Sequence, residues 1–371
     1  MKKFRVIQFT IANTQGGHTQ YILNNWKFIN KEIFHFDFVT MDKISVLKEG
    51  LERQGCKVYQ ISCYAEENEK QFIKEVKEIL MKGYDAIHIH TKYWKSFLVE
   101  KIAKECGIPK IIVHSHNSSM DNDYDGAGDE LKMHYALREM LCVDIATDFW
   151  ACSQVAVDWL YGEKVPHDMI RILPNAINIS KYSYNKVTRD KMRERLVGRQ
   201  KNKYILGNCG RFVYQKNHKF LIEIFAEIHQ HIPDTVLMLL GEGKLKKTIE
   251  KRAKELGIAD AVKFEGLVDN VSEYMQAFDL FLLPSHFEGL PIALVEAQAA
   301  GLKCLVSENV SREANVSGCV DFLKLSKELW CEKILESYLN IGERYDNNRI
   351  MIEQGFDLSK QIKELEHLYL S

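Results

Sequence analysis

The sequence lacks the features of a secreted, zinc-binding or membrane-spanning protein. Its nine cysteines are odd in number and form no C-x-x-C pair, so neither a disulfide framework nor a zinc site is indicated. No apolar stretch approaches the roughly 20 residues of a membrane span. We therefore expect a protein of the reducing cytoplasm that is soluble or bound peripherally at the cytoplasmic membrane.

Two further absences argue against nucleic acid as the main partner and against a dinucleotide-dependent enzyme. The 50 basic and 51 acidic residues give a formal net charge of −1, so there is no overall electrostatic attraction for nucleic acid. The G-x-G-x-x-G fingerprint of dinucleotide-binding domains is missing after the first expected strand, Arg5–Thr10, which argues against a nicotinamide-dependent dehydrogenase.

What the sequence does contain is a regular alternation of strands and helices. Short β-branched or aromatic runs alternate with amphipathic stretches, the pattern of repeated βαβ units and parallel sheets. In the first half, strands are expected at Arg5–Thr10, Phe36–Thr40, Lys57–Ser62, Ala86–Thr91, Lys110–His114 and Phe149–Ser153, and helices at Gly17–Asn30, Glu66–Met81, Trp94–Cys106 and Glu130–Leu141. In the second half, strands are expected at Tyr204–Asn208, Thr235–Leu240, Val262–Glu265, Leu280–Pro284 and Lys303–Ser307, and helices at Phe220–His231, Leu245–Leu256 and Pro291–Ala300.

This pattern predicts an α/β fold of two doubly wound domains, because 371 residues exceed the size at which one core usually keeps growing. We place the first domain at residues 1–180 and the second at 181–355. The second opens with a basic connector and surface helix over Lys181–Lys203. Residues 356–371 are predicted to form a terminal helix that packs back on the first domain. Its inner face is expected to carry three apolar residues: Ile362, Leu365 and Leu368.

The most informative segment is PSHFEGLPIALVEAQAAG at residues 284–301. It follows an apolar strand, and open α/β sheets bind ligands at the carboxyl ends of their strands. The backbone at Gly289 and Leu290, at the start of a helix, suits a phosphate group. Glu288 and Glu296 can accept hydrogen bonds from hydroxyl groups. Taken singly, the two glutamates would be a solvated loop acid and a helix-surface acid.

This string resembles the E-x7-E signature of retaining glycosyltransferases of GT-B architecture, specifically glycosyltransferase family 4 in bacterial polysaccharide assembly. Residues 206–301 match that family's nucleotide-sugar domain in order and spacing. The other matching motifs are Gly210-Arg211-Phe212-Val213-Tyr214-Gln215-Lys216-Asn217, Leu240-Gly241-Glu242-Gly243 and Phe264-Glu265-Gly266. The resemblance implies two Rossmann-like domains that face each other across a cleft, with the donor in the second and the acceptor in the first.

The resemblance also implies roles for single residues. Glu296 would bind the ribose hydroxyls of a nucleotide, and Glu288 would contact a hydroxyl of the donor sugar. Arg211 and Lys216 would grip the diphosphate. Two cations can neutralise the charge that grows on a departing diphosphate, so neither a metal ion nor a cofactor is expected. Three backbone positions would complete the donor site: Gly210, Gly289 and Leu290.

In the first domain, Gly16 and Gly17 follow the first strand and let the backbone approach a phosphate or an acceptor, although plain turns use such pairs as often. Many relatives place a glutamate two residues after the second glycine, where this chain has Thr19. The resemblance leaves the role of that position open.

Histidines cluster near two expected strand ends. The resemblance assigns a cleft histidine after the strand Lys110–His114, and we prefer His116 because it lies further beyond the strand. Its imidazole could hydrogen-bond a sugar hydroxyl or orient the acceptor. A histidine satisfied by backbone groups is the alternative. We interpret His88 and His90 as structural.

The segment Asp121-Asn122-Asp123-Tyr124-Asp125-Gly126 resembles the start of a calcium loop, but its twelfth position is Lys132, where glutamate is needed. Its D-x-D pattern also occurs as a metal ligand in the GT-A architecture, which would leave the motifs from Arg211 to Glu296 unexplained. We interpret Asp121–Asp129 as an acidic loop over the acceptor cleft. Leu173–Asn178 resembles the family's turn between domains, where a hinge is expected.

The function implied by the resemblance is retaining transfer of a sugar from a nucleotide sugar, most often a UDP-sugar, to a glycan or lipid-linked glycan in cell-surface polysaccharide synthesis. The stretch Lys92–Lys95, with Lys101 and Lys104, could rest on anionic lipid or could be a solvated helix face. Two alternatives stay open: a nucleotide-sugar epimerase of the same fold, and a non-catalytic nucleotide-sugar-binding protein.

Overall fold

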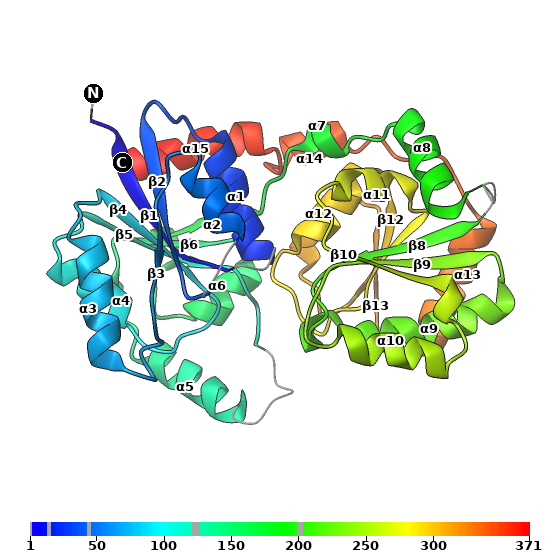
Figure 1. Cartoon of the computed structure of the whole chain (residues 1–371), viewed down its shortest axis with the longest axis horizontal. Helices are drawn as coiled ribbons and strands as arrows, with labels where there is room; N and C mark the ends of the chain where they lie inside the picture. Colours follow the sequence, from blue (N-terminus) through cyan, green and yellow to red (C-terminus); the bar gives the residue numbers. More distant parts are fainter. Residues whose placement is uncertain (1, 13–15, 43–45, 121–126, 199–202) are drawn as a thin grey trace. The chain divides into compact units, whose positions relative to one another are not determined.

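The computed structural model describes residues 2–12, 16–42, 46–120, 127–198 and 203–371. It divides into two compact units, one formed by Met1–Asn175 together with Leu358–Ser371 and the other by Ala176–Asp357. Each unit has its own parallel sheet with helices packed around it (Figure 1). The predicted α/β class with two doubly wound, Rossmann-like units is confirmed.

The first unit is built on a seven-stranded parallel sheet in the order β3-β2-β1-β4-β5-β6-β7. Its strands are β1 (Phe4–Ile11), β2 (Phe34–Thr40), β3 (Val58–Gln60), β4 (Ala86–Thr91), β5 (Lys110–Ser115), β6 (Asp148–Ala151) and β7 (Ile170–Ile172). Its helices are α1 (Gly17–Phe28), α2 (Val46–Glu52), α3 (Glu69–Leu80), α4 (Leu98–Glu105), α5 (Ala127–Glu139), α6 (Gln154–Leu160) and α15 (Leu358–Leu370). The strand order reverses between β1 and β4, which is where doubly wound sheets bind ligands.

The second unit is built on a six-stranded parallel sheet in the order β10-β9-β8-β11-β12-β13. Its strands are β8 (Tyr204–Cys209), β9 (Thr235–Leu240), β10 (Val262–Gly266), β11 (Leu280–Leu283), β12 (Lys303–Ser307) and β13 (Val320–Leu323). Its helices are α7 (Ile179–Tyr182), α8 (Lys186–Val197), α9 (His218–His231), α10 (Lys246–Glu255), α11 (Val271–Ala277), α12 (Ile292–Ala299), α13 (Lys327–Leu339) and α14 (Asn348–Glu353). Figure 1 shows α9 and α10 on one side of this sheet and α11 and α12 on the other. Here the order reverses between β8 and β11.

Two expected helix features are wrong. Trp94 lies outside α4, which begins at Leu98, because its indole is buried and donates a hydrogen bond to the carbonyl of Leu160 at 2.7 Å. On the terminal helix α15, Tyr369 rather than Leu368 is buried beside Leu365. The apolar spacing suggested leucine, whereas the tyrosine hydroxyl finds a buried polar partner.

The basic stretch at the start of the second unit is not simply a surface feature. Arg189 and Arg193 on α8 both form ion pairs with Asp279, the latter pair at 2.9 Å. Asp279 also accepts a hydrogen bond from the backbone of Ile205 at 2.7 Å. Two of the basic residues therefore clamp α8 to the sheet, where the sequence suggested only solvated charge.

Replacing Asp279 with Asn is expected to lower the free energy of unfolding by about 2 kcal/mol, the usual contribution of hydrogen bonds to charged groups. Urea denaturation would measure the change. The matched control is Asp321→Asn, because Asp321 is 44% exposed and its ion pair with Lys303 lies at the surface. That change should cost under about 0.5 kcal/mol. Equal losses in the two variants would contradict the clamp.

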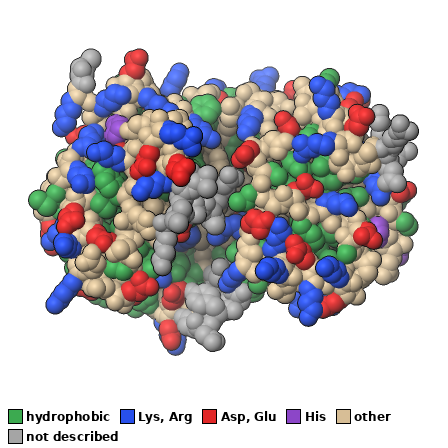
Figure 2. Space-filling view, viewed as in Figure 1, with side chains coloured by type: hydrophobic (Ala, Val, Ile, Leu, Met, Phe, Trp, Pro, Cys, Tyr) green, Lys and Arg blue, Asp and Glu red, His purple; other side chains and the backbone are tan. Residues whose placement is uncertain are grey.

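No helix in the described ranges is both long enough and apolar enough to cross a membrane. On the face shown in Figure 2, basic and acidic side chains are intermixed over each unit, in line with the net charge of −1.

Candidate functional site

The main candidate site lies in the second unit, at the carboxyl ends of β8 and β11. These strands are neighbours at the point where the strand order reverses. The loops that follow them are joined by hydrogen bonds: the amide of His286 donates to the carbonyl of Gln215 at 2.8 Å, and the Gln215 side chain donates to the carbonyl of Phe287 at 3.2 Å. Two motifs about 70 residues apart in the sequence thus lie together at the carboxyl-end edge of the second sheet.

Glycine is required where the loop after β8 meets the loop after β9. A Cβ at Gly241, whose φ is +135°, would lie 2.2 Å from the carbonyl oxygen of Gly210. A Cβ at Gly243 would lie 2.5 Å from the carbonyl oxygen of Phe212. A Cβ at Gly210 would lie 3.2 Å from Cδ of Lys216, so the lysine stem passes close to this glycine. The glycines let the backbone pass close to the base of this lysine.

Lys216 and Glu288 form an ion pair between the loops that follow β8 and β11. The ammonium of Lys216 lies 2.5 Å from Oε1 of Glu288, and the glutamate is 6% exposed. Ser285 Oγ donates to the same carboxylate at 3.0 Å, and Gln215 Nε2 donates to its other oxygen at 3.4 Å. Glu288 is therefore a buried, well-hydrogen-bonded carboxylate rather than a solvated loop acid.

Glu296 is also buried, at 8% exposure, on α12. The hydroxyl of Tyr182 donates to its Oε1 at 2.5 Å. Burial raises the pKa of Glu296 to about 7, against which the Tyr182 hydrogen bond and the charge of Lys181 act. The interpretation of Glu296 as a helix-surface acid is excluded by this burial.

Cys209, the last residue of β8, ties Glu296 to Lys216. The pKa of its thiol is raised to about 12, mainly by burial and also by the Glu296 carboxylate, while the Lys216 ammonium acts in the opposite direction. One strand end therefore lies within the electrostatic reach of both charged groups. Lys216 and Glu288 are in direct contact, and Glu296 lies on α12, which begins just after the loop that carries Glu288.

The remaining predicted donor-site residues lie in the same loops. Gly289 and Leu290 are buried, and α12 begins directly after Pro291. Arg211 is partly exposed, and within the described part of the chain its guanidinium forms no ion pair. Its grip on a diphosphate stays a prediction.

Two features of the site could not be found from the sequence. Tyr182 contacts Glu296 across 114 positions. The ring of Tyr214 stacks on that of His286, with centroids 4.3 Å apart, beside Lys216 and Glu288. No spacing rule links such pairs; only the placement of the loops does.

In the first unit, Gly17 begins α1 and Gly16 precedes it with an ordinary φ of −72°. A side chain at Gly17 would meet nothing within 4 Å, so the backbone there is open to approach and no turn requires the glycine. Thr19 is buried and accepts a hydrogen bond from the amide of Ala12 at 3.1 Å. Thr19 therefore serves the loop itself.

His116 lies just past the end of β5 and is 8% exposed. Its Nε2 contacts Nδ1 of His90 at 2.9 Å, so its partner is another histidine rather than a backbone group. His88, His90 and His114 each place one nitrogen within 4.8 Å of the others, close enough for a metal ion. Hydrogen bonds already occupy both nitrogens of His88 and of His90. A metal would have to displace them, and its absence stays a prediction.

The stretch proposed for lipid contact is largely neutralised within the fold. Trp94 is buried, and Tyr93 donates to Glu130 at 2.9 Å. Lys95 also pairs with Glu130, at 3.2 Å, and Lys104 pairs with an aspartate at 3.4 Å. No tryptophan is therefore exposed there for a lipid surface. The acidic loop predicted at Asp121–Asp129 falls, over 121–126, outside the described residues.

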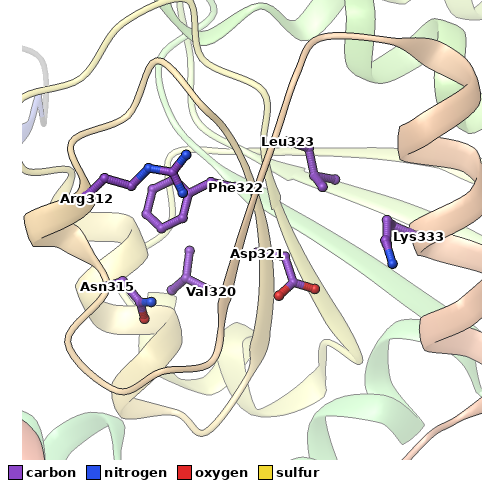
Figure 3. Close-up of a pocket in the computed structure, with 7 residues that line it drawn as sticks. All are labelled: Arg312, Asn315, Val320, Asp321, Phe322, Leu323 and Lys333. Carbon is purple, nitrogen blue, oxygen red and sulfur yellow. The ribbon is translucent and has the colours of Figure 1, made fainter.

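A separate surface pocket lies beside the edge strand β13 (Figure 3). Its lining residues are Arg312, Asn315, Val320, Asp321, Phe322, Leu323 and Lys333. The Arg312 guanidinium covers the ring of Phe322 at 4.1 Å. None of the predicted site residues lines this pocket.

Two Rossmann-like units, the second with a cationic and acidic cluster at its switch point, are the architecture of GT-B glycosyltransferases. Residues 189–316 match the family model described as Glycosyl transferases group 1. That match covers the whole of the cluster around Lys216, Glu288 and Glu296.

Relatives extend the likeness to nearly the full chain. The putative glycosyltransferase EpsF of Bacillus subtilis is 27% identical over 98% of this chain and 96% of its own length. The UDP-Gal:alpha-D-GlcNAc-diphosphoundecaprenol alpha-1,3-galactosyltransferase of Escherichia coli is 22% identical over 81% of this chain and 79% of its own. These matches support a glycosyltransferase.

Solved structures confirm the fold. Anabaena Alr3699/HepE in complex with UDP and glucose superposes with a TM-score of 0.78 at 17% identity, over 100% of both chains. Sucrose-phosphate synthase from Thermosynechococcus elongatus reaches a TM-score of 0.77 at 16% identity, over 99% of this chain and 98% of that one. The predicted GT-B architecture is thereby confirmed.

Proposed function

We propose that this chain is a retaining glycosyltransferase that moves a sugar from a UDP-sugar to a glycan or lipid-linked glycan during polysaccharide synthesis. The observation that carries the proposal is the meeting of Lys216 and Glu288 at 2.5 Å beside buried Glu296, at the switch point of the second unit. The name of the Escherichia coli relative contains a diphosphoundecaprenol-linked sugar acceptor, and that of a Staphylococcus aureus relative contains capsular polysaccharide biosynthesis. They support the acceptor class.

The donor site works through charge and hydrogen bonding. Glu296 accepts hydrogen bonds from the ribose hydroxyls, and Glu288 accepts one from a hydroxyl of the donor sugar. Lys216 and Arg211 neutralise the diphosphate as the bond to the sugar breaks. Because two cations supply this charge, we expect transfer without a metal ion.

The retaining step needs no enzymic nucleophile. The acceptor hydroxyl attacks the anomeric carbon from the face that the diphosphate leaves, and a departing phosphate oxygen takes the hydroxyl proton. Glu288 positions the sugar and forms no bond to it. Lys216 exchanges its contact with Glu288 for one with the diphosphate when the donor binds.

Binding of UDP-glucose is expected to strengthen about tenfold from about pH 6 to about pH 8, as the competent fraction rises. The pKa of Glu296 is about 7 through burial, and only the ionised carboxylate accepts two hydroxyl hydrogen bonds. UDP-glucose suits the test because both its phosphates are diesters. Titration calorimetry of the wild type and of Glu296→Gln would decide: a flat wild-type profile contradicts this role.

The same pKa has a consequence for stability. Because the folded value lies above the ordinary 4.5, the folded chain holds the Glu296 proton more tightly than the unfolded chain. The contribution of Glu296 to the free energy of unfolding therefore falls as pH rises between those two values.

The proposed activity is tested by incubating the chain with UDP-sugars, with and without a lipid-linked glycan, and with chelator. Acceptor-dependent release of UDP and a product with the donor's anomeric configuration are expected. An isomerised UDP-sugar without acceptor would indicate an epimerase, and UDP binding without turnover a binding protein. Sedimentation with vesicles, with and without anionic lipid, tests the predicted peripheral position at the cytoplasmic membrane.

A further inference from the structure

A continuous chain of hydrogen bonds crosses the interior of the first unit, and the proposed transfer step leaves it unexplained. Its links join buried side chains whose polar atoms approach within 3.1 Å of the next: in order, His116, His90, Gln8, Tyr369, His88 and His114. They come from β1, β4, β5, the position just past the end of β5, and the terminal helix α15. Residues from opposite ends of the sequence thus share one network.

The four histidine side chains of this hydrogen-bond network are neutral. Burial lowers the pKa of each well below its usual value, and burial together with the Lys92 ammonium lowers that of His116 to about 3. A neutral imidazole carries a proton on one ring nitrogen and a lone pair on the other. Each hydrogen bond therefore determines which nitrogen of the next ring is protonated.

Gln8 sets the direction toward His116. Its Oε1, which can only accept, contacts Nε2 of His90 at 2.7 Å, so that nitrogen carries the proton. Nδ1 of His90 is then a lone pair, which accepts from Nε2 of His116 at 2.9 Å. Nδ1 of His116 is left as a lone pair.

Tyr369 continues the same donor-to-acceptor direction from Gln8 toward His114, the other end of the hydrogen-bond network. Gln8 Nε2 donates to the tyrosine hydroxyl at 3.1 Å, which leaves the hydroxyl proton for Nδ1 of His88 at 2.7 Å. Nε2 of His88 then donates to Nδ1 of His114 at 3.1 Å. Every donor points from His116 toward His114.

The terminal nitrogen atom at each end of the hydrogen-bond network has no hydrogen bond to a further group among the described residues. Nδ1 of His116 and Nε2 of His114 are buried atoms without a hydrogen-bond partner in the described structure. In the reverse direction His116 would present an N–H instead, next to the positive charge of Lys92. The direction set by Gln8 places the lone pair there, which the cation favours.

We propose that Gln8 and Tyr369 are positioning residues that hold His116 as the tautomer with its proton on Nε2 and a lone pair on Nδ1. This lone pair accepts a hydrogen bond from a hydroxyl group. On the basis of the proposed function, that hydroxyl belongs to the sugar acceptor. The terminal helix thus sets the hydrogen-bonding character of a residue at the end of β5.

Nitrogen NMR on protein labelled at histidine tests the assignment directly, because protonated and bare ring nitrogens differ widely in chemical shift. In the wild type, His116 should show a proton on Nε2 alone. Tyr369→Phe and Gln8→Leu each remove two hydrogen bonds of the network, so both tautomers of His116 should be populated in these variants.

The matched control is Tyr161→Phe. Tyr161 is a buried tyrosine of the same unit whose hydroxyl reaches the carbonyls of Val113 and Trp150, each at 2.8 Å, outside the histidine chain. This variant should lose stability as Tyr369→Phe does and keep the wild-type tautomer. This control separates the effect of Tyr369 on the His116 tautomer from a general loss of packing.

Kinetics give the second readout. Tyr369→Phe should bind UDP-glucose as the wild type does and transfer about two- to tenfold more slowly, because part of the molecules hold the wrong tautomer. If the wild type transfers no sugar, the proposed function fails. The NMR result still decides whether Gln8 and Tyr369 fix the tautomer of His116. A proton on Nδ1 of His116 in the wild type, an unchanged tautomer in both variants, or a stoichiometric metal ion on the imidazoles would overturn the proposal.

Discussion

Replacing Lys216 with Ala is expected to lower the rate of sugar transfer by about 10²–10³-fold, the usual effect of removing one group that stabilises a transition-state charge. The reason is that Lys216 is the cation nearest to Glu288 at the switch point, with its stem seated against Gly210. Initial rates at saturating UDP-sugar and acceptor would measure the loss.

This substitution is also expected to affect stability, which the sequence alone did not suggest. Glu288 would lose its counter-ion in a buried position, a change that costs about 3 kcal/mol or more. The double variant Lys216→Ala with Glu288→Gln should regain stability and remain slow. Arg211→Ala is the cleaner test of charge, because the described structure gives it no ion pair to lose. Wild-type rates in these variants would remove both cations from the mechanism.

Replacing Glu296 with Gln is expected to weaken UDP binding by about 10–100-fold, since hydrogen bonds to a charged group contribute about 1.5–3 kcal/mol each. The amide is of nearly the same size and can still accept from Tyr182, so the fold should survive. Titration calorimetry with UDP would measure the change.

Tyr182→Phe is the matched control for that effect. It keeps the carboxylate and removes only the hydroxyl that contacts it at 2.5 Å. Binding should weaken far less than in Glu296→Gln. An unchanged affinity for UDP in Glu296→Gln would mean that the nucleotide does not use this carboxylate.

The fold was predictable to the extent that strands are apolar and continuous. The buried runs of β4, β5, β9 and β11 match their expected ranges closely, because each is rich in aliphatic residues and is buried along nearly its whole length, although β4 and β5 also carry buried histidines. The short strands β7 and β13, at the edges of their sheets, have three and four residues and were missed. Edge strands are half solvated, so their composition does not stand out.

The donor cluster was predictable because its motifs follow strand ends, and strand ends of a parallel sheet meet at one edge. The ion pair of Lys216 with Glu288 and the contact of Tyr182 with Glu296 were not. Both depend on how loops and helices from distant positions in the sequence pack. The histidine chain was missed for the same reason: alternation on β4 suggested structural residues, and only Tyr369 on α15 shows how they are connected.

The most direct test of the donor site is a crystal structure of the chain with UDP bound. The ribose hydroxyls are predicted to lie within hydrogen-bonding distance of Glu296, with the Lys216 ammonium moved from Glu288 to the diphosphate. A nucleotide bound elsewhere, or a diphosphate out of reach of a lysine still paired with Glu288, would contradict the account.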